Sequence, residues 1–171
     1  MTMKIIGIIQ ARTGSTRCPR KVFADLAGKT VLERVIERCQ RATLHDVIVA
    51  VPSHERDAFT MVECTGAYLA TPIVPEDDLV GRHFYAALTA GADVVVRVPS
   101  DNPCVEPAEI DRLVRAYLVA NGEPDWMWTN THQLRANGYP DGIGAELYSI
   151  GILQWLHEQA KHPQIREHPH Y

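Results

Sequence analysis

Short apolar runs alternate with amphipathic segments along most of the chain. Residues 4–10 (KIIGIIQ) are rich in β-branched side chains and apolar on both faces, which is typical of a central parallel strand covered by helices. Later runs of the same kind predict strands over residues 46–51, 67–69, 93–98, 125–130 and 145–149. These runs are expected to form a largely buried sheet.

Segments with helical periodicity lie between the predicted strands. Thr30 followed by Glu33 predicts a capping box, and apolar positions from Val31 to Cys39 give this first helix a buried stripe. Further helices are predicted over residues 54–65, 79–90, 107–121 and 152–160. The alternation indicates the α/β class, with a mostly parallel sheet, helices on both faces and ligands beyond the carboxyl ends of the strands.

The loop at the end of the first strand, residues 10–21 (QARTGSTRCPRK), combines small residues with positive charges. Backbone amides near Gly14 and Ser15 can donate to phosphate oxygens, and cations beside them can neutralise the phosphate charge. The cations are Arg12, Arg17 and Lys21. The loop therefore predicts a phosphate cradle, with a solvated basic loop as the alternative.

A second loop, within VRVPSDNP, brings Asp101 and Asn102 out of the sheet between two prolines. Magnesium prefers hard oxygen ligands and commonly takes one or two protein carboxylates together with substrate phosphates. Asp101 is therefore predicted to hold Mg²⁺ opposite the phosphate loop, with an Asx-turn as the alternative. Glu146, in the strand predicted over residues 145–149, is the candidate for a second carboxylate ligand.

Composition narrows the class of protein. A chain of 171 residues with 46% hydrophobic and 22% charged residues is predicted to form one domain over residues 1–171. The net charge of −4 argues against nucleic acid as a partner, because such binding normally needs a basic surface. The apolar runs fall short of the roughly 20 residues of a membrane helix, and the widely spaced cysteines predict reduced thiols in the cytoplasm.

Five motifs resemble a known family in their sequence and order. They are QARTGSTRCPRK, EDDLVGRHFYAA, DVVVRVPSDNP, YPDGIGAEL and a terminal REH. Together they resemble the SpsF-like cytidylyltransferases, relatives of the acylneuraminate and 3-deoxy-manno-octulosonate cytidylyltransferases. The resemblance implies a three-layer α/β/α sandwich of the nucleotide-diphospho-sugar transferase (GT-A-like) fold. It also implies an Mg²⁺-dependent enzyme that transfers CMP from CTP to an acidic sugar, with release of pyrophosphate, for surface or spore coat polysaccharide.

The resemblance also implies roles for individual residues. The floor for base and ribose is expected at Gln10, Ala11 and Arg12. The triphosphate cradle is expected at Gly14, Ser15, Arg17 and Lys21, of which Arg17 and Lys21 are catalytic with Asp101. The metal ligands are expected to be Asp101 and Glu146. The substrate side is expected to use Arg82, Asn102, Tyr139 and Asp141, where Arg82 contacts nucleotide or sugar or forms a structural ion pair.

This chain departs from the family pattern in places. Arg20 stands where relatives usually have a glycine, and Gly144 stands where they often have an acidic residue. Family members commonly continue well past REH, so we expect a fragment or a naturally short form. A homodimer is expected from the resemblance.

Two other functions fit the same motifs. One is a catalytically weak nucleotide-binding domain that serves as a subunit in glycan assembly. The other is a GT-A glycosyltransferase, which is less favoured because the chain has no Asp-X-Asp string.

Overall fold

Six strands form one sheet in the part of the chain that the computed structural model describes, which is residues 2–15, 18–123, 126–130, 140 and 142–167. The strand order is β3-β2-β1-β4-β6-β5. The strands are β1 (Ile5–Gln10), β2 (Asp46–Ala50), β3 (Tyr68–Ala70), β4 (Val94–Pro99), β5 (Trp128–Thr129) and β6 (Glu146–Ser149). Strands β1 to β4 run parallel, whereas β6 pairs antiparallel with both β4 and β5. The prediction of a mostly parallel sheet is confirmed.

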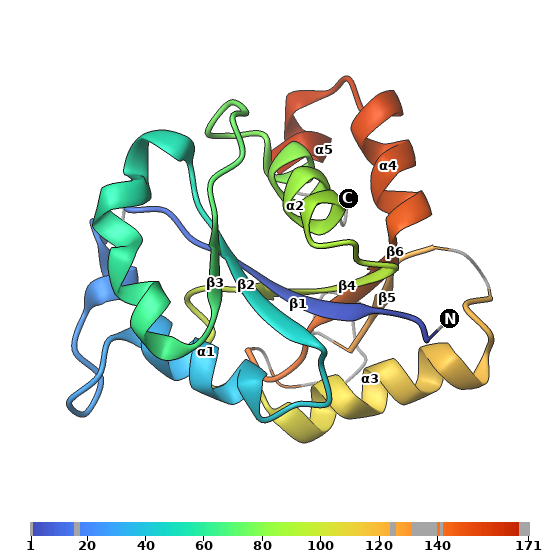
Figure 1. Cartoon of the computed structure of the whole chain (residues 1–171), viewed down its shortest axis with the longest axis horizontal. Helices are drawn as coiled ribbons and strands as arrows, with labels where there is room; N and C mark the ends of the chain where they lie inside the picture. Colours follow the sequence, from blue (N-terminus) through green and yellow to red (C-terminus); the bar gives the residue numbers. More distant parts are fainter. Residues whose placement is uncertain (1, 16–17, 124–125, 131–139, 141, 168–171) are drawn as a thin grey trace.

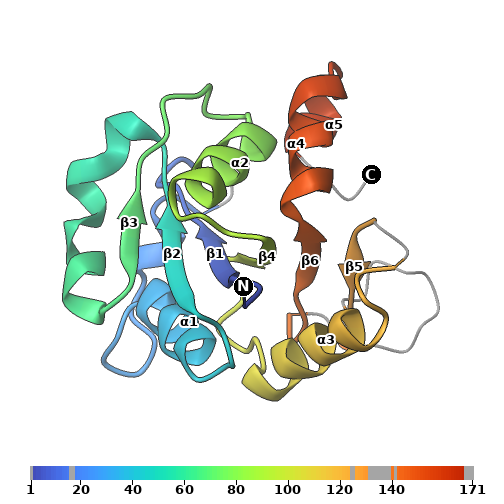
Figure 2. The same ribbon diagram turned by 45° about the vertical axis from the view of Figure 1, so that its right-hand side comes forward.

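Helices cover both faces of the sheet. Figures 1 and 2 show α2, α4 and α5 on one face and α1 and α3 on the other. Their bounds are α1 (Val31–Gln40), α2 (Leu79–Thr89), α3 (Pro107–Val119), α4 (Ile150–Gln159) and α5 (Pro163–Glu167). The 3-10 segments are η1 (Lys21–Phe23) and η2 (Ser53–Thr65). The predicted three-layer α/β/α fold is therefore confirmed. None of the helices in the described ranges combines the length and the apolar character that a membrane span requires.

Successive side chains of β1 point to opposite faces of the sheet, which explains why helices pack on both faces. Ile5 and Ile9 pack into the core beneath α1 and α3, while Ile6 and Ile8 pack into the core beneath α2 and α4. All four side chains are buried, so β1 is apolar on both faces because it lies in the middle of the sheet. The capping box at the start of α1 also forms, since Thr30 and Glu33 exchange hydrogen bonds.

Two predicted elements differ from the structure, and one observed helix was not predicted. The segment predicted as a helix over residues 54–65 is the 3-10 segment η2, whose buried Phe59 and Val62 are three residues apart and so match its repeat of three residues per turn. The strand predicted over 125–130 is only Trp128–Thr129. Residues Pro163–Glu167, for which no element was predicted, form the short helix α5.

The parallel pairing of β1 with β4 positions the functional loops. The register runs from Ile5 opposite Val94 to Gln10 opposite Pro99, so both strands end at the same edge of the sheet. The loop that begins at Gln10 and the loop that contains Asp101 therefore emerge side by side.

Gly144 lies where the backbone comes very close to another segment. A Cβ atom at this position would lie 2.0 Å from the backbone oxygen of Asn130. Asn130 holds the two segments together. Its Oδ1 accepts a hydrogen bond from the amide of Ala145 (2.8 Å), and its Nδ2 donates to the carbonyl of Glu109 (2.9 Å). An acidic side chain, which the resemblance led us to expect here, does not fit this backbone.

Gly144→Ala is expected to lower the free energy of unfolding by about 1–3 kcal/mol, because the new methyl group has to displace backbone. Urea unfolding measures the change. Gly151→Ala is the matched control, since its Cβ would meet only Ser149 Oγ at 3.6 Å and the substitution favours helix. Equal effects of the two substitutions would contradict the close approach at Gly144.

Candidate functional site

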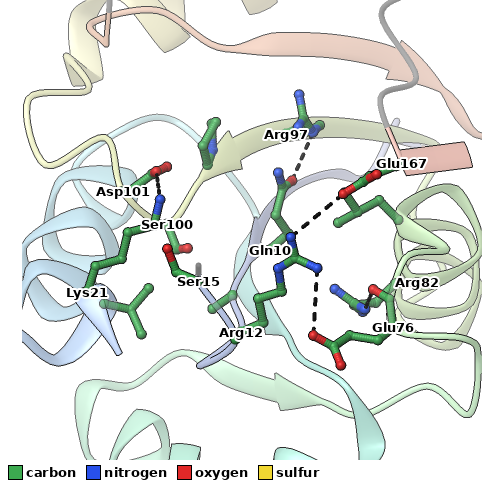
Figure 3. A pocket seen from close by; sticks show the side chains of 15 residues that line it. Gln10, Arg12, Ser15, Lys21, Glu76, Arg82, Arg97, Ser100, Asp101 and Glu167 are labelled. Carbon is green, nitrogen blue, oxygen red and sulfur yellow. Dashed lines mark hydrogen bonds and ion pairs between the residues drawn. The ribbon is translucent and has the colours of Figure 1, made fainter. Parts of the chain in front are cut away.

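A cavity of about 260 Å³ opens at the shared edge of β1 and β4. Figure 3 shows its side chains converging from the loop after β1, the loop after β4, the start of α2 and the end of α5. The lining residues are Gln10, Ala11, Arg12, Gly14, Ser15, Lys21, Val22, Glu76, Leu79, Arg82, Arg97, Pro99, Ser100, Asp101 and Glu167. The cavity is thus lined by both of the loops in which the sequence predicted site residues, the loop after β1 and the loop that contains Asp101.

Most of the predicted site residues meet at this cavity. Those that line it are Gln10, Ala11, Arg12, Gly14, Ser15, Lys21, Arg82 and Asp101. Asn102 and Glu146 are not part of the lining. Arg17, Tyr139 and Asp141 lie outside the described residues. Arg97, Glu76 and Glu167 line the cavity although no role was predicted for them.

The loop after β1 is held in a tight turn. The amides of Ser15 and Arg20 both donate to the carbonyl of Thr13, at 3.0 and 3.1 Å. Glu55 of η2 anchors the turn from below by accepting hydrogen bonds from the amide (2.8 Å) and the hydroxyl (2.6 Å) of Thr13. Because the Ser15 amide is already bonded to Thr13, Ser15 can serve a ligand through its hydroxyl.

Arg20 adopts the left-handed conformation, with φ 56°. This conformation normally favours glycine, the residue that the resemblance led us to expect here. The side chain of Arg20 lies over the ring of Phe23, with the guanidinium carbon 5.2 Å from the ring centre. A cation–π contact of this kind offsets part of the backbone cost and turns the Arg20 charge away from the cavity lining.

An ion pair between Lys21 and Asp101 connects the two loops across one side of the cavity (Figure 3). Both side chains are partly exposed, at 34% and 42%. An ammonium and a carboxylate that are this accessible can exchange partners when a phosphate or a cation enters. Within the described chain, no three His, Cys, Asp or Glu side chains gather to hold a metal ion. A metal here would take Asp101 and ligands from the substrate.

Arg12 lies on the other side of the cavity between two carboxylates. Its guanidinium is 3.6 Å from Glu76 and 3.7 Å from Glu167. Glu167 reaches this position because its neighbour Arg166 pairs with Asp78 at 2.6 Å, which docks α5 on the first turn of α2. The contact explains how a short helix with no buried residue contributes to the site.

Arg82 is a buried cation at the wall of the cavity. Its side chain is 1% exposed, and its Nη2 donates to the carbonyl of Glu76. Within the described residues, its Nε has no hydrogen-bond partner and no carboxylate lies within ion-pair distance. Burial, followed by the nearby charge of Arg12, lowers the pKa of Arg82. Two neighbouring guanidiniums of which one is buried form a site that an anion would stabilise.

A row of polar side chains crosses three adjacent strands behind the cavity. Arg97 of β4 forms an ion pair with Glu146 of β6 (Nη1 to Oε2, 2.5 Å), and its Nε donates to Oε1 of Gln10 on β1 (2.8 Å). Arg97 and Glu146 are 4% and 2% exposed. The carboxylate of Glu146, which was predicted to hold a metal, is thus bound to Arg97 in this structure.

His83 lies next to this row within α2 and is fully buried. Its Nδ1 lies 2.7 Å from the carbonyl of Leu79, so this nitrogen carries the proton of the neutral ring. Burial, and secondly the charge of Arg97, lower the pKa of His83 to about 3. The ring is therefore neutral at physiological pH and adds no positive charge beside Arg97.

Comparison with known proteins identifies similar chains. The family model described as cytidylyltransferase matches residues 6–167. An uncharacterised protein of Methanocaldococcus jannaschii is 34% identical over 167 residues, which is 97% of this chain and 65% of that protein. A 3-deoxy-manno-octulosonate cytidylyltransferase of Trichlorobacter lovleyi is 35% identical over 118 residues, 68% of this chain and 46% of that enzyme. The chain thus spans less than two thirds of either relative.

Solved structures share the fold. A cytidylyltransferase from Leptospira borgpetersenii superposes with a TM-score of 0.88 at 26% identity, covering 98% of this chain and 69% of that one. A CMP:2-keto-3-deoxy-manno-octonic acid synthetase complexed with CTP superposes with a TM-score of 0.72 at 18% identity, covering 96% of this chain and 82% of that one.

Arg82→Met is expected to leave the free protein as stable or more stable by about 1 kcal/mol, because a buried donor without a partner costs free energy. The same variant is expected to lose most of the stabilisation by tripolyphosphate. Urea unfolding with and without tripolyphosphate measures both effects. Arg115→Met, on the exposed side of α3, is the control. An undiminished tripolyphosphate effect in Arg82→Met would show that Arg82 is not an anion-binding group.

His83→Gln is expected to weaken the acid sensitivity of folding. The unfolded chain protonates His83 near pH 6.5, whereas the folded-state pKa is about 3, so stability is lost as the pH falls between these values. Removing the ring should flatten the unfolding free energy between pH 6.5 and pH 3 relative to the native protein. Denaturation in urea at several pH values checks the slope, with the exposed His54→Gln as control. Identical slopes would contradict a buried neutral His83.

Proposed function

The chain belongs to the cytidylyltransferase family, and on this premise we propose that it transfers CMP from CTP to an acidic sugar and releases pyrophosphate. The observation that carries the proposal is the cavity, in which a phosphate-type loop lies opposite Asp101. Lys21 of this loop forms an ion pair with Asp101. Nucleotidyl transfer needs charge neutralisation and alignment more than covalent help from the protein, and this cavity supplies both.

The nucleotide is proposed to occupy the side of the cavity formed by the loop after β1. Gly14 and the Ser15 hydroxyl face the phosphates, and Lys21 leaves Asp101 to donate to the β- and γ-phosphates. Arg82 adds positive charge at the neighbouring wall, beside Arg12 and its two carboxylate partners Glu76 and Glu167. Gln10 and Ala11 form the floor for the ribose and base, and the choice of cytosine rests on the family. Arg17 joins the cradle as part of the same loop.

Magnesium is the proposed cofactor, and the donor set of the cavity fits it. Asp101 offers one accessible carboxylate at the position where the phosphates of the substrate would supply the remaining oxygen ligands. Bound there, the ion would neutralise charge on the α-phosphate and favour attack at phosphorus. The partial exposure of Asp101 and the presence of Lys21 as an exchangeable partner support this role. Glu146 is instead proposed to position Arg97, with which it forms an ion pair.

The protein residues are proposed to align an in-line displacement. A hydroxyl of the sugar attacks the α-phosphorus, the bond to the pyrophosphate oxygen breaks, and the hydroxyl proton passes to solvent. Lys21 and the loop after β1 stabilise the charge that develops on the leaving pyrophosphate. The sugar then enters from the side away from Lys21. Asn102, Tyr139 and Asp141 stay the proposed substrate-binding residues of the chain.

The proposed acceptor is a sugar acid of the kind used in surface polysaccharide. Several similar proteins are 3-deoxy-manno-octulosonate cytidylyltransferases, which makes this sugar acid the first acceptor to test. The buried guanidinium of Arg82, which has no carboxylate within ion-pair distance among the described residues, also supports an acidic acceptor over a neutral one.

Asp101→Asn is expected to lower kcat by about 10²–10³-fold, because the neutral amide is a poor magnesium ligand. Pyrophosphate release from CTP, Mg²⁺ and 3-deoxy-manno-octulosonate measures turnover. Asp57→Asn, at an exposed position in η2, is the matched control. Full turnover in Asp101→Asn would remove Asp101 from the proposal, and no release by the native chain with any sugar acid would overturn the transferase itself.

A further inference from the structure

We propose that Arg97 binds the carboxylate of the acceptor sugar and that Glu146 is the positioning residue that holds Arg97 for this task. The inference rests on the proposed function in taking a sugar acid as the acceptor. It assigns a ligand to Arg97, for which the family motifs predicted no role. It also gives Glu146, the candidate second metal ligand, a positioning role that follows from its ion pair with Arg97.

A buried ion pair in the middle of a sheet is unusual in energetic terms. Arg97 interrupts the apolar strand β4, and its neighbour on the same face, Val95, packs into the core beneath α2 and α4. Replacing a buried ion pair by apolar side chains is often neutral or stabilising, so folding alone does not require Arg97 and Glu146 here. A function at the cavity accounts for the charge, because Arg97 lines the cavity and Glu146 does not.

The hydrogen bonds of Arg97 leave one edge of its guanidinium for a ligand. Its Nε is bonded to Gln10 and its Nη1 to Glu146. Within the described residues, Nη2 has no hydrogen-bond partner. Two contacts from two different strands fix the plane of the guanidinium, so Glu146 determines the direction in which Nη2 donates. An arginine held in this way is pre-organised for a carboxylate oxygen.

The position of Arg97 favours the acceptor over the nucleotide. Figure 3 shows Lys21, Ser15 and Asp101 together on one side of the cavity and Arg97 away from them. In an in-line displacement the leaving pyrophosphate and the attacking hydroxyl lie on opposite sides of the α-phosphorus. With pyrophosphate on Lys21, the sugar lies toward Arg97. Glu146 already balances the charge of Arg97. The pair therefore suits a ligand group with one negative charge, such as a carboxylate, better than the several charges of a triphosphate.

The test compares 3-deoxy-manno-octulosonate with its C1 amide, which lacks the negative charge. Calorimetry measures the binding of both to the protein saturated with Mg²⁺ and α,β-methylene-CTP, which cannot react. The native protein is expected to bind the acid roughly 10- to 100-fold more tightly than the amide, the range expected for a hydrogen bond to a charged group. Arg97→Lys is expected to remove most of this difference while CTP-analogue affinity changes less than about threefold.

Two further variants separate positioning from folding. Glu146→Gln keeps Arg97 but removes its ion-pair partner, so the guanidinium is held less firmly. The ratio of the affinity for the acid to the affinity for the amide should therefore fall part of the way. The double variant Arg97→Gln with Glu146→Gln leaves neither charge buried alone, so it keeps the test valid where Arg97→Lys fails to fold. Arg38→Lys is the matched control, because it alters an arginine–glutamate pair outside the cavity, with Glu106.

The outcomes are distinct for the two proposals. An acid-to-amide ratio that is unchanged in Arg97→Lys or in the double variant overturns the role of Arg97, as does a native protein that does not distinguish acid from amide or binds neither. An equal loss of CTP-analogue affinity also overturns it, because Arg97 would then serve the nucleotide. Arg97-dependent binding of the acid without any pyrophosphate release from CTP supports this inference and contradicts the transferase activity.

Discussion

The parallel pairing of β1 with β4 is the constraint on which the site depends. It brings the end of β1 opposite Pro99, so that the loop beginning at Gln10 and the loop containing Asp101 leave the sheet together. The apolar faces of both strands are covered by helices, which fixes this register through two cores. Lys21 and Asp101 are far apart in sequence, and they meet because the two strands end at one edge.

The same edge concentrates buried charge. Arg82 and Arg97 are almost fully buried beside the cavity, and the fold holds them with backbone carbonyls, Gln10 and Glu146. Such groups cost free energy unless they are satisfied, and they are enriched at functional sites. The unpartnered Nε of Arg82 and the open edge of Arg97 mark the two places where ligand oxygens would do so.

The sequence predicts the layers of this fold well because they follow from local periodicity. The run of residues 4–10 and the capping box at Thr30 each carry their signal within a few residues, and the structure has a strand and a helix start there. The phosphate-type loop and Asp101 could likewise be placed at one edge, since parallel strands end together. The residues that line the cavity include both.

What local patterns do not reveal are contacts between distant residues. Arg97 and Glu146 are 49 positions apart, and only the antiparallel pairing of β6 with β4 shows that they form an ion pair. Arg97 is the single charged residue within the run VVVRV of residues 94–98, which was a signal for it, but its partner Glu146 carries no comparable signal in the sequence. Helix α5 has no buried residue and therefore no apolar stripe, so Glu167 could not be placed at the cavity from sequence. Glu76 likewise reaches Arg12 only through the fold.

The most direct test of the account is a crystal structure of the protein with CTP and Mn²⁺, an anomalous scatterer that replaces Mg²⁺. The account predicts a manganese peak bonded to the Asp101 carboxylate and to phosphate oxygens, with Lys21 moved from Asp101 to the phosphates and the guanidinium of Arg97 still held by Glu146. Nucleotide bound elsewhere, such as in the groove between β3 and α2, or manganese bound without Asp101, would contradict it.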